Sequence, residues 1–125
     1  MTQKEFEALY ENNWSEWKKF PNPDKKEYLF APFGPGVYQL RHSSFDHDCP
    51  EEFILFGSGK NVAFRMSSLL PKPKGEGTRK NKEKREYILE NIDRIEYRTI
   101  AFEHKEEARV FEKYVKGKES YIFST

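Results

Sequence analysis

Residues 36–66 read GVYQLRHSSFDHDCPEEFILFGSGKNVAFRM, and two strands and a helix are predicted within them. The first predicted strand, at 37–42, alternates between two faces, with Val37 and Gln39 on one and Tyr38 and Leu40 on the other. This period of two is typical of a strand whose faces meet different surroundings.

The second predicted strand is the continuous apolar run FILF at 53–56. A run of this kind is typical of a strand that is covered on both sides, so we expect it in the interior of a sheet. The polar stretch before it is short enough for an antiparallel hairpin. From Lys60 to Pro71, apolar residues return at helical spacing, which predicts a helix of about ten residues.

Outside this stretch, helical spacing of aromatic residues predicts an N-terminal helix over 3–18, followed by a Pro-rich connector. After a loop rich in Pro, Gly and Lys, the sequence predicts a helix at 84–92, a third strand at 94–102 and a helix at 104–116. The last nine residues could add a short edge strand or fray. We therefore expect an α/β (α+β) fold with a small three-stranded, mostly antiparallel sheet flanked by helices.

The chain has 125 residues, which suits one compact domain, divided here into an N-terminal helix and linker at 1–33 and a domain at 34–125. Its single cysteine, Cys49, excludes an intramolecular disulfide and any multi-cysteine metal site. No apolar run is long enough to span a bilayer, and the N-terminus lacks the pattern of a signal peptide. We expect a cytoplasmic protein without a membrane partner.

The pairing of GVY at 36–38 with LFG at 55–57 resembles the GIY-YIG nuclease superfamily. In that family a strand with GIY is followed by a strand with YIG and then by a helix with an arginine eight residues beyond the YIG glycine. Gly57 and Arg65 have that spacing. The resemblance covers about residues 34–116 and implies a GIY-YIG-like fold with an extra N-terminal helix.

The resemblance implies an endonuclease that hydrolyses DNA phosphodiester bonds with one divalent metal, Mg²⁺ or Mn²⁺. It points to Tyr38, Arg65 and Glu112 as catalytic residues, with Glu112 as the metal ligand. These residue types suit the reaction, because a guanidinium matches a phosphate and a single carboxylate can hold Mg²⁺. Tyr38 would orient or deprotonate the attacking water, and as a base it would need a nearby cation.

Two positions depart from the family pattern. Leu55 stands where the family has its second tyrosine, and Leu69 stands where it has a further His or Tyr. Either Tyr38 works alone, or another group such as Lys60 replaces a missing one. The alternative function is a catalytically impaired domain of this fold that binds nucleic acid or a protein partner.

Positive charge is concentrated in residues 59–88, which hold nine basic and three acidic side chains, an excess of six, although the whole chain has a net charge of only +1. Six of these cations are expected to contact nucleic-acid phosphates: Lys60, Arg79, Lys80, Lys82, Lys84 and Arg85. A solvated lysine-rich loop is the alternative interpretation. The expected partner is DNA, and target choice is left to loops, a homodimer or a separate specificity partner.

Overall fold

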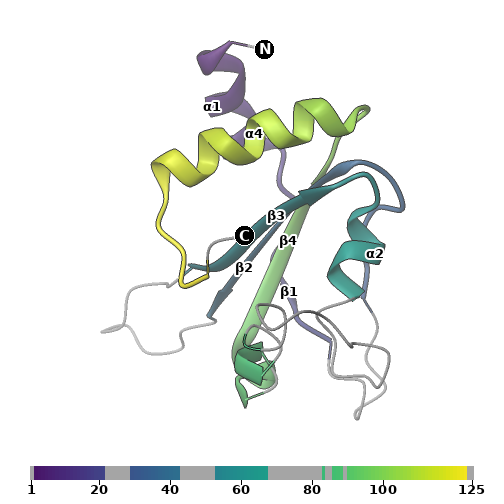
Figure 1. The fold of residues 1–125 in the computed structure, drawn as a ribbon, viewed down its shortest axis with the longest axis vertical. Helices are drawn as coiled ribbons and strands as arrows, with labels where there is room; N and C mark the ends of the chain where they lie inside the picture. The colour runs from purple at the N-terminus through teal and green to yellow at the C-terminus, as the bar shows by residue number, and fades with distance from the viewer. Residues whose placement is uncertain are drawn as a thin grey trace.

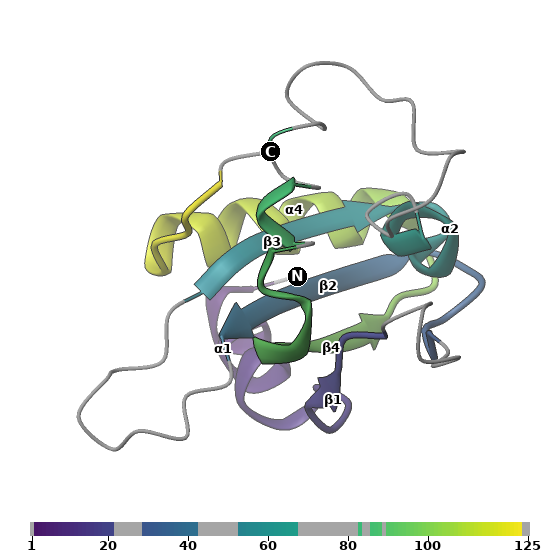
Figure 2. The same cartoon turned by 90° about the horizontal axis from the view of Figure 1, so that it is seen from below.

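The computed structural model describes residues 2–21, 29–42, 53–67, 83, 86–88 and 90–123. Its centre is an antiparallel sheet in the order β1-β4-β2-β3, formed by β1 (Lys18–Lys19), β2 (Gly36–His42), β3 (Phe53–Gly59) and β4 (Ile95–Ala101). Helix α4 (Lys105–Lys118) crosses one side of the sheet with α1 (Gln3–Asn12) beyond it, and α2 (Val62–Ser67) lies on the other side (Figures 1 and 2). The predicted α+β class is confirmed, with β1 as a fourth, two-residue strand.

Each face of the sheet supports a separate apolar core. On the face of α4, Val37 and Phe56 pack with Phe111 of that helix, and Phe6 of α1 stacks on Tyr114. The members of the core on the other face are Phe20, Tyr38, Leu40, Ile54, Leu55, Val62, Met66, Ile88, Ile92, Ile95 and Tyr97. The alternation predicted for 37–42 therefore holds, because neighbouring residues of β2 enter different cores.

Strand β3 lies at the edge of the described sheet, so the expectation of an interior strand is wrong. Its middle residues are nevertheless buried, because helices cover both faces and face burial alone does not distinguish an edge strand from a central one. The C-terminal residues lie along its outer side, where Ile122 N–H donates to the Phe53 carbonyl at 3.2 Å and Phe123 N–H to that of Ile54 at 3.0 Å. Of the two alternatives for the C-terminal residues, an edge strand or fraying, the described part of the tail up to Phe123 forms no assigned strand but makes these two bonds to β3.

The N-terminal helix ends at Asn12, not at residue 18 as predicted. Beyond Asn13 the chain turns toward the sheet, where Ser15 N–H donates to the Thr99 carbonyl at 2.9 Å. Trp14 then packs edge-on against Phe56 instead of continuing the helical stripe. A bond to β4 thus replaces the next helical turn. The division of the chain at residue 33 stays a prediction.

The other elements agree with the sequence apart from their ends. Helix α2 begins at Val62, two residues later than predicted, and α4 continues through Gly117 to Lys118. Between α2 and β4, the described residues 83, 86–88 and 90 are helical, and a 3-10 helix follows at Ile92–Arg94. Among the described helices, none combines the length and the apolar character that a membrane span would need.

Candidate active site

Tyr38 lies in the middle of β2, between Gly57 of β3 and Thr99 of β4, and its side chain is 3% exposed. The phenol ring lies directly over Gly57. A Cβ atom at residue 57 would stand 2.3 Å from the Tyr38 hydroxyl oxygen, which is closer than real atoms approach. Glycine is required at this position because any side chain would displace the tyrosine.

Arg65 extends from α2 to the same point. Its guanidinium donates a hydrogen bond to the Tyr38 hydroxyl, while the residue as a whole stays exposed to solvent. The start of α2 is fixed by backbone bonds, with Val62 N–H donating to the Gly34 carbonyl at 3.1 Å and Ala63 N–H to that of Pro32 at 2.9 Å. Arg65 is therefore supported at its base and accessible at its charged end.

The protonation state of Tyr38 follows from these surroundings. Burial raises its pKa from 10.0 to about 12, since a phenolate would lose its solvation. The Arg65 guanidinium opposes this rise by its charge and its hydrogen bond, whereas the Glu112 carboxylate adds to it. The hydroxyl is therefore neutral at physiological pH, although a cation stands beside it.

Glu112 reaches the site from α4, and both oxygens of its carboxylate have partners. The Ser58 hydroxyl donates to Oε1 at 2.6 Å, and the Lys116 ammonium lies 2.8 Å from Oε2. Lys116 is one helical turn further along α4, so the pair has the favourable i, i+4 spacing. The carboxylate side chain is 19% exposed, which leaves it accessible from the pocket.

Arg65 and Glu112 line an open pocket of about 420 Å³ between the ends of β3, α2 and α4, and Tyr38 adjoins it through its bond to Arg65. The pocket is lined by Ser58, Gly59, Lys60, Arg65, Lys105, Arg109 and Glu112. Four of these side chains are cationic and one is anionic, an excess of three positive charges. An excess of this sign in a concave site attracts polyanions.

The sequence analysis missed two of the pocket cations, Lys105 and Arg109. A signal for them was present, because Lys105, Arg109, Glu112 and Lys116 recur at spacings of four, three and four. Residues at such spacings lie on one face of a helix. Helical periodicity around Glu112 therefore indicates both cations as its neighbours.

The pocket fits a divalent cation only as a single-carboxylate site. Among the described residues, no group of three His, Cys, Asp or Glu side chains converges. Mg²⁺ commonly keeps several waters and binds through one or two carboxylates, so Glu112 alone meets the minimum. Lys116 would have to leave Oε2 for a cation to bind there.

The remaining predicted residues divide into two groups. Lys60 lines the pocket, and its contact with nucleic acid stays a prediction, whereas Leu69 and the cations Arg79, Lys80, Lys82, Lys84 and Arg85 lie outside the described residues. Leu55 is 1% exposed and pairs with Leu40, on the same face of the sheet as Tyr38. It contributes to the apolar core and not to the polar pocket.

The fold that brings these residues together is similar to that of a solved nuclease domain. A solved GIY-YIG endonuclease domain matches 81% of this chain and 94% of its own length, with 25% sequence identity and a TM-score of 0.54. That structure is the N-terminal domain of UvrC from Thermotoga maritima, bound to its catalytic divalent cation, magnesium. No family model matches the sequence, and no curated protein matches it. The protein thus has a GIY-YIG-like endonuclease fold.

Proposed function

We propose that the protein is a metal-dependent endonuclease that hydrolyses DNA phosphodiester bonds, with Tyr38, Arg65 and Glu112 as its catalytic residues. The observation that carries the proposal is that Arg65 of α2 and Glu112 of α4 line one cationic pocket, while the buried Tyr38 hydroxyl of β2 bonds to that same Arg65. The likeness to an endonuclease domain solved with its catalytic magnesium supports the reaction class.

In this proposal, Arg65 binds the phosphate that is cleaved. Its guanidinium is exposed, and a planar fork of donors can contact two phosphate oxygens at once. The same donors can stabilise the charge that develops on these oxygens in the transition state. The bond to Tyr38 holds the guanidinium beside the pocket that Arg65 lines.

Tyr38 acts as a neutral hydroxyl. Because burial raises its pKa to about 12, a phenolate is scarce at physiological pH, so the hydroxyl orients the attacking water and does not deprotonate it. Its oxygen accepts the hydrogen bond from Arg65, and in the proposed role its own O–H donates to the attacking water. Of the two roles considered from the sequence, orientation is the one that we propose.

Glu112 would hold the divalent cation, and Ser58 would keep its carboxylate turned toward the pocket. A bound Mg²⁺ supplies positive charge that stabilises the leaving oxygen. The contribution of this chain is a carboxylate oriented by the 2.6 Å bond from Ser58. Lys116 balances that carboxylate as long as no cation is bound.

Phosphates on either side of the cleaved bond are proposed to contact Lys60, Lys105 and Arg109. Lys60 comes from the end of β3 and the other two from the first turns of α4, so they flank the catalytic residues from two directions. Such contacts position a nucleic acid without reading its sequence. The lysine-rich segment after α2 is proposed, from its sequence, to extend them.

The test is incubation of purified protein with supercoiled and branched DNA in Mg²⁺, Mn²⁺ or EDTA. Arg65→Ala and Glu112→Gln are each expected to lower the cleavage rate by about 10²- to 10³-fold, since each removes charge stabilisation of the transition state. The matched controls are Arg94→Ala and Glu106→Gln, which change exposed residues outside the pocket and should cut like the wild type.

Cleavage that needs the metal and is lost in both site variants supports the proposal. Intact DNA under every condition, together with salt-sensitive DNA binding, would instead assign the protein to the catalytically impaired alternative. Equal cleavage by the site variants and their controls would show a contaminating nuclease.

A further inference from the structure

Residues 29–35 form an irregular segment that is held firmly to the rest of the protein. Phe30 N–H donates to the Tyr97 hydroxyl at 2.9 Å, and that hydroxyl donates to the Phe30 carbonyl at 3.3 Å. Further along, the Pro32 and Gly34 carbonyls accept from α2, and the Pro35 carbonyl accepts from Phe102 N–H at 2.8 Å. Hydrogen bonds to Tyr97 of β4 and to the start of α2 therefore fix the path of the segment.

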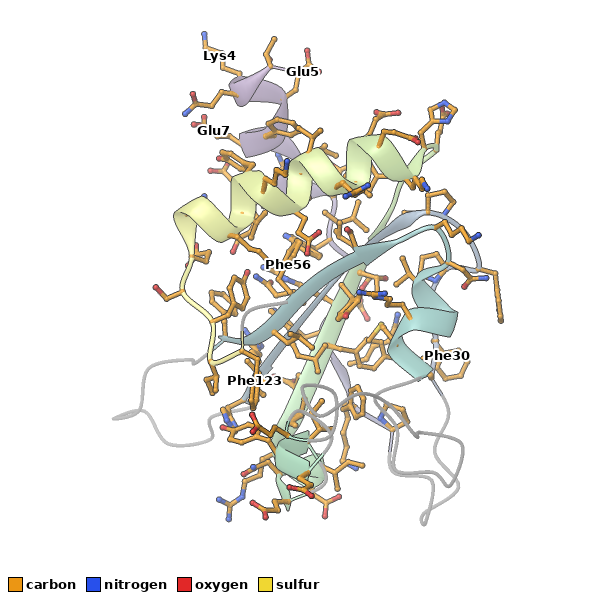
Figure 3. The ribbon with its side chains drawn as sticks, viewed as in Figure 1. Lys4, Glu5, Glu7, Phe30, Phe56 and Phe123 are labelled. Carbon is orange, nitrogen blue, oxygen red and sulfur yellow. The ribbon has the colours of Figure 1, made fainter. Side chains whose placement is uncertain are left out.

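Two aromatic side chains project from this fixed segment into solvent. Phe33 is 87% exposed and Phe30 is 65% exposed, whereas the described phenylalanines of the two cores are nearly or fully buried. Figure 3 shows Phe30 beside α2 and directed away from the sheet. Large apolar side chains on a rigid backbone offer a surface whose conformation is already set before a partner binds.

The segment that carries Phe33 is bonded to the start of α2 and continues into β2 beside the pocket-lining end of β3. Pro32 and Gly34, the neighbours of Phe33, bond to the first residues of α2, the helix that carries Arg65. Gly36, three residues further on, pairs with Gly59, which lines the pocket together with Lys60. An exposed aromatic ring and a cluster of cations thus share one end of the sheet.

The chemistry of a partner follows from this combination. The first two N–H groups of α2 donate to the Gly34 and Pro32 carbonyls, so they are not available to bind an anion. Anions near Phe33 are therefore expected to be bound by the cationic side chains of the pocket. A partner that offers both phosphates for the cations and a flat apolar face for Phe33 is a nucleotide strand. Stacking of a base on an aromatic side chain is favourable with any of the bases.

We propose that Phe33 stacks on an unpaired nucleobase of the DNA strand whose phosphates enter the cationic pocket. The inference rests on the proposed nuclease function and adds a substrate class to it. A base inside a duplex is stacked on both sides and is not accessible to Phe33. The preferred substrate therefore has an unpaired nucleotide near the cleaved bond, as in a flap, a bulge or a branch.

The experiment uses the full chain and a DNA duplex with a short single-stranded flap that carries the fluorescent base 2-aminopurine, in EDTA so that nothing is cut. Stacking on Phe33 should quench the fluorescence on binding, and Phe33→Ala should abolish the quenching and weaken flap binding by about tenfold. Phe33→Trp keeps an aromatic surface and should restore both. Val110→Ala, a change at an exposed apolar residue of α4 outside the pocket, is the matched control.

A quench that is lost in Phe33→Ala and regained in Phe33→Trp supports the proposal, whether or not the protein cuts DNA. An absent quench in the wild type, or equal flap binding by wild type and Phe33→Ala, overturns it. Dimerisation of the free protein that disappears in Phe33→Ala also overturns it, because the ring would then serve self-association. If the Phe33 proposal is overturned but the wild type still cuts DNA in a metal-dependent way, the proposed nuclease function stands.

Discussion

Tyr38 and Gln39 are neighbours on β2, both are buried, and each bonds to an arginine, but the two sites they anchor are opposite in character. Tyr38 points toward α2, where Arg65 is exposed and an open pocket follows. Gln39 points toward α4 and is surrounded by partners on every side. Tyr38 thus adjoins an open polar site between α2 and α4, whereas Gln39 belongs to a closed polar site on the α4 face of the sheet.

The closed site satisfies every group of Gln39. Its Nε2 donates to the Tyr121 hydroxyl at 2.8 Å and to that of Tyr10 at 3.4 Å, and its Oε1 accepts from Arg98 Nε at 2.7 Å. Arg98 in turn lies over Trp14, 4.3 Å from the ring centroid. Burial lowers the pKa of Arg98 and raises that of Tyr121.

The contrast separates two uses of polar residues. In the Gln39 cluster the hydrogen bonds connect α1, β4 and the C-terminal segment to β2, so its cation, Arg98, is used to hold the fold together. In the pocket the cations converge on open space with one carboxylate among them. Changes in the first should affect stability, and changes in the second should affect cleavage.

Tyr38→Phe tests the open site. Loss of the hydroxyl is expected to lower the cleavage rate by about 10³-fold, because the attacking water loses the group that orients it. Since the pKa of Tyr38 is about 12, the ratio of wild-type to variant rates should stay constant between about pH 7 and pH 9. A ratio that grows tenfold per pH unit would show that the phenolate acts as a base, contrary to our proposal.

Gln39→Leu tests the closed site. It leaves Arg98 and two tyrosine hydroxyls without their buried partner, so the free energy of unfolding is expected to fall by about 3 kcal/mol. Urea denaturation, monitored by tryptophan fluorescence, measures this change in the free energy of unfolding. Cleavage by the folded fraction should match the wild type, and a loss of cleavage with unchanged stability would remove the distinction between the two sites.

Gly57→Ala and Gly59→Ala test whether cleavage depends on the position of the Tyr38 ring, without removing any functional group. A Cβ at residue 57 would collide with the Tyr38 phenol, whereas a Cβ at residue 59 would meet Arg65 carbons at 3.6 Å, an ordinary contact. Displacement of Tyr38 is expected to slow cleavage by about 10²-fold in Gly57→Ala. The cleavage rate of Gly59→Ala should stay within a few-fold of the wild-type rate. Equal cleavage rates for the two variants would show that cleavage does not depend on the Tyr38 ring lying over residue 57.

Local pattern in the sequence was sufficient for much of the fold, whereas the site needed the family resemblance. The alternation over 37–42 predicted which residues face each core, because it depends only on the geometry of a single strand. Arg65 and Glu112, which line one pocket, were predicted from the resemblance to the GIY-YIG superfamily.

Features that depend on distant contacts were missed. Trp14 has the spacing of a helix face, but a bond from Ser15 to Thr99 draws the chain out of the helix, and only the folded sheet supplies that partner. The edge position of β3 likewise depends on strand order, which face burial does not specify. Phe33 was overlooked because an exposed aromatic residue in a Pro- and Gly-rich segment has no periodic pattern.

The C-terminal residues that lie along β3 also bear on how the protein behaves at high concentration. An exposed strand edge with free amides and carbonyls can pair with the edge of another molecule and start aggregation. The bonds from Ile122 and Phe123 occupy two carbonyls of that edge, at Phe53 and Ile54. The tail thus blocks part of the β3 edge from pairing with another molecule. Its removal would favour intermolecular sheets that extend from one chain into the next.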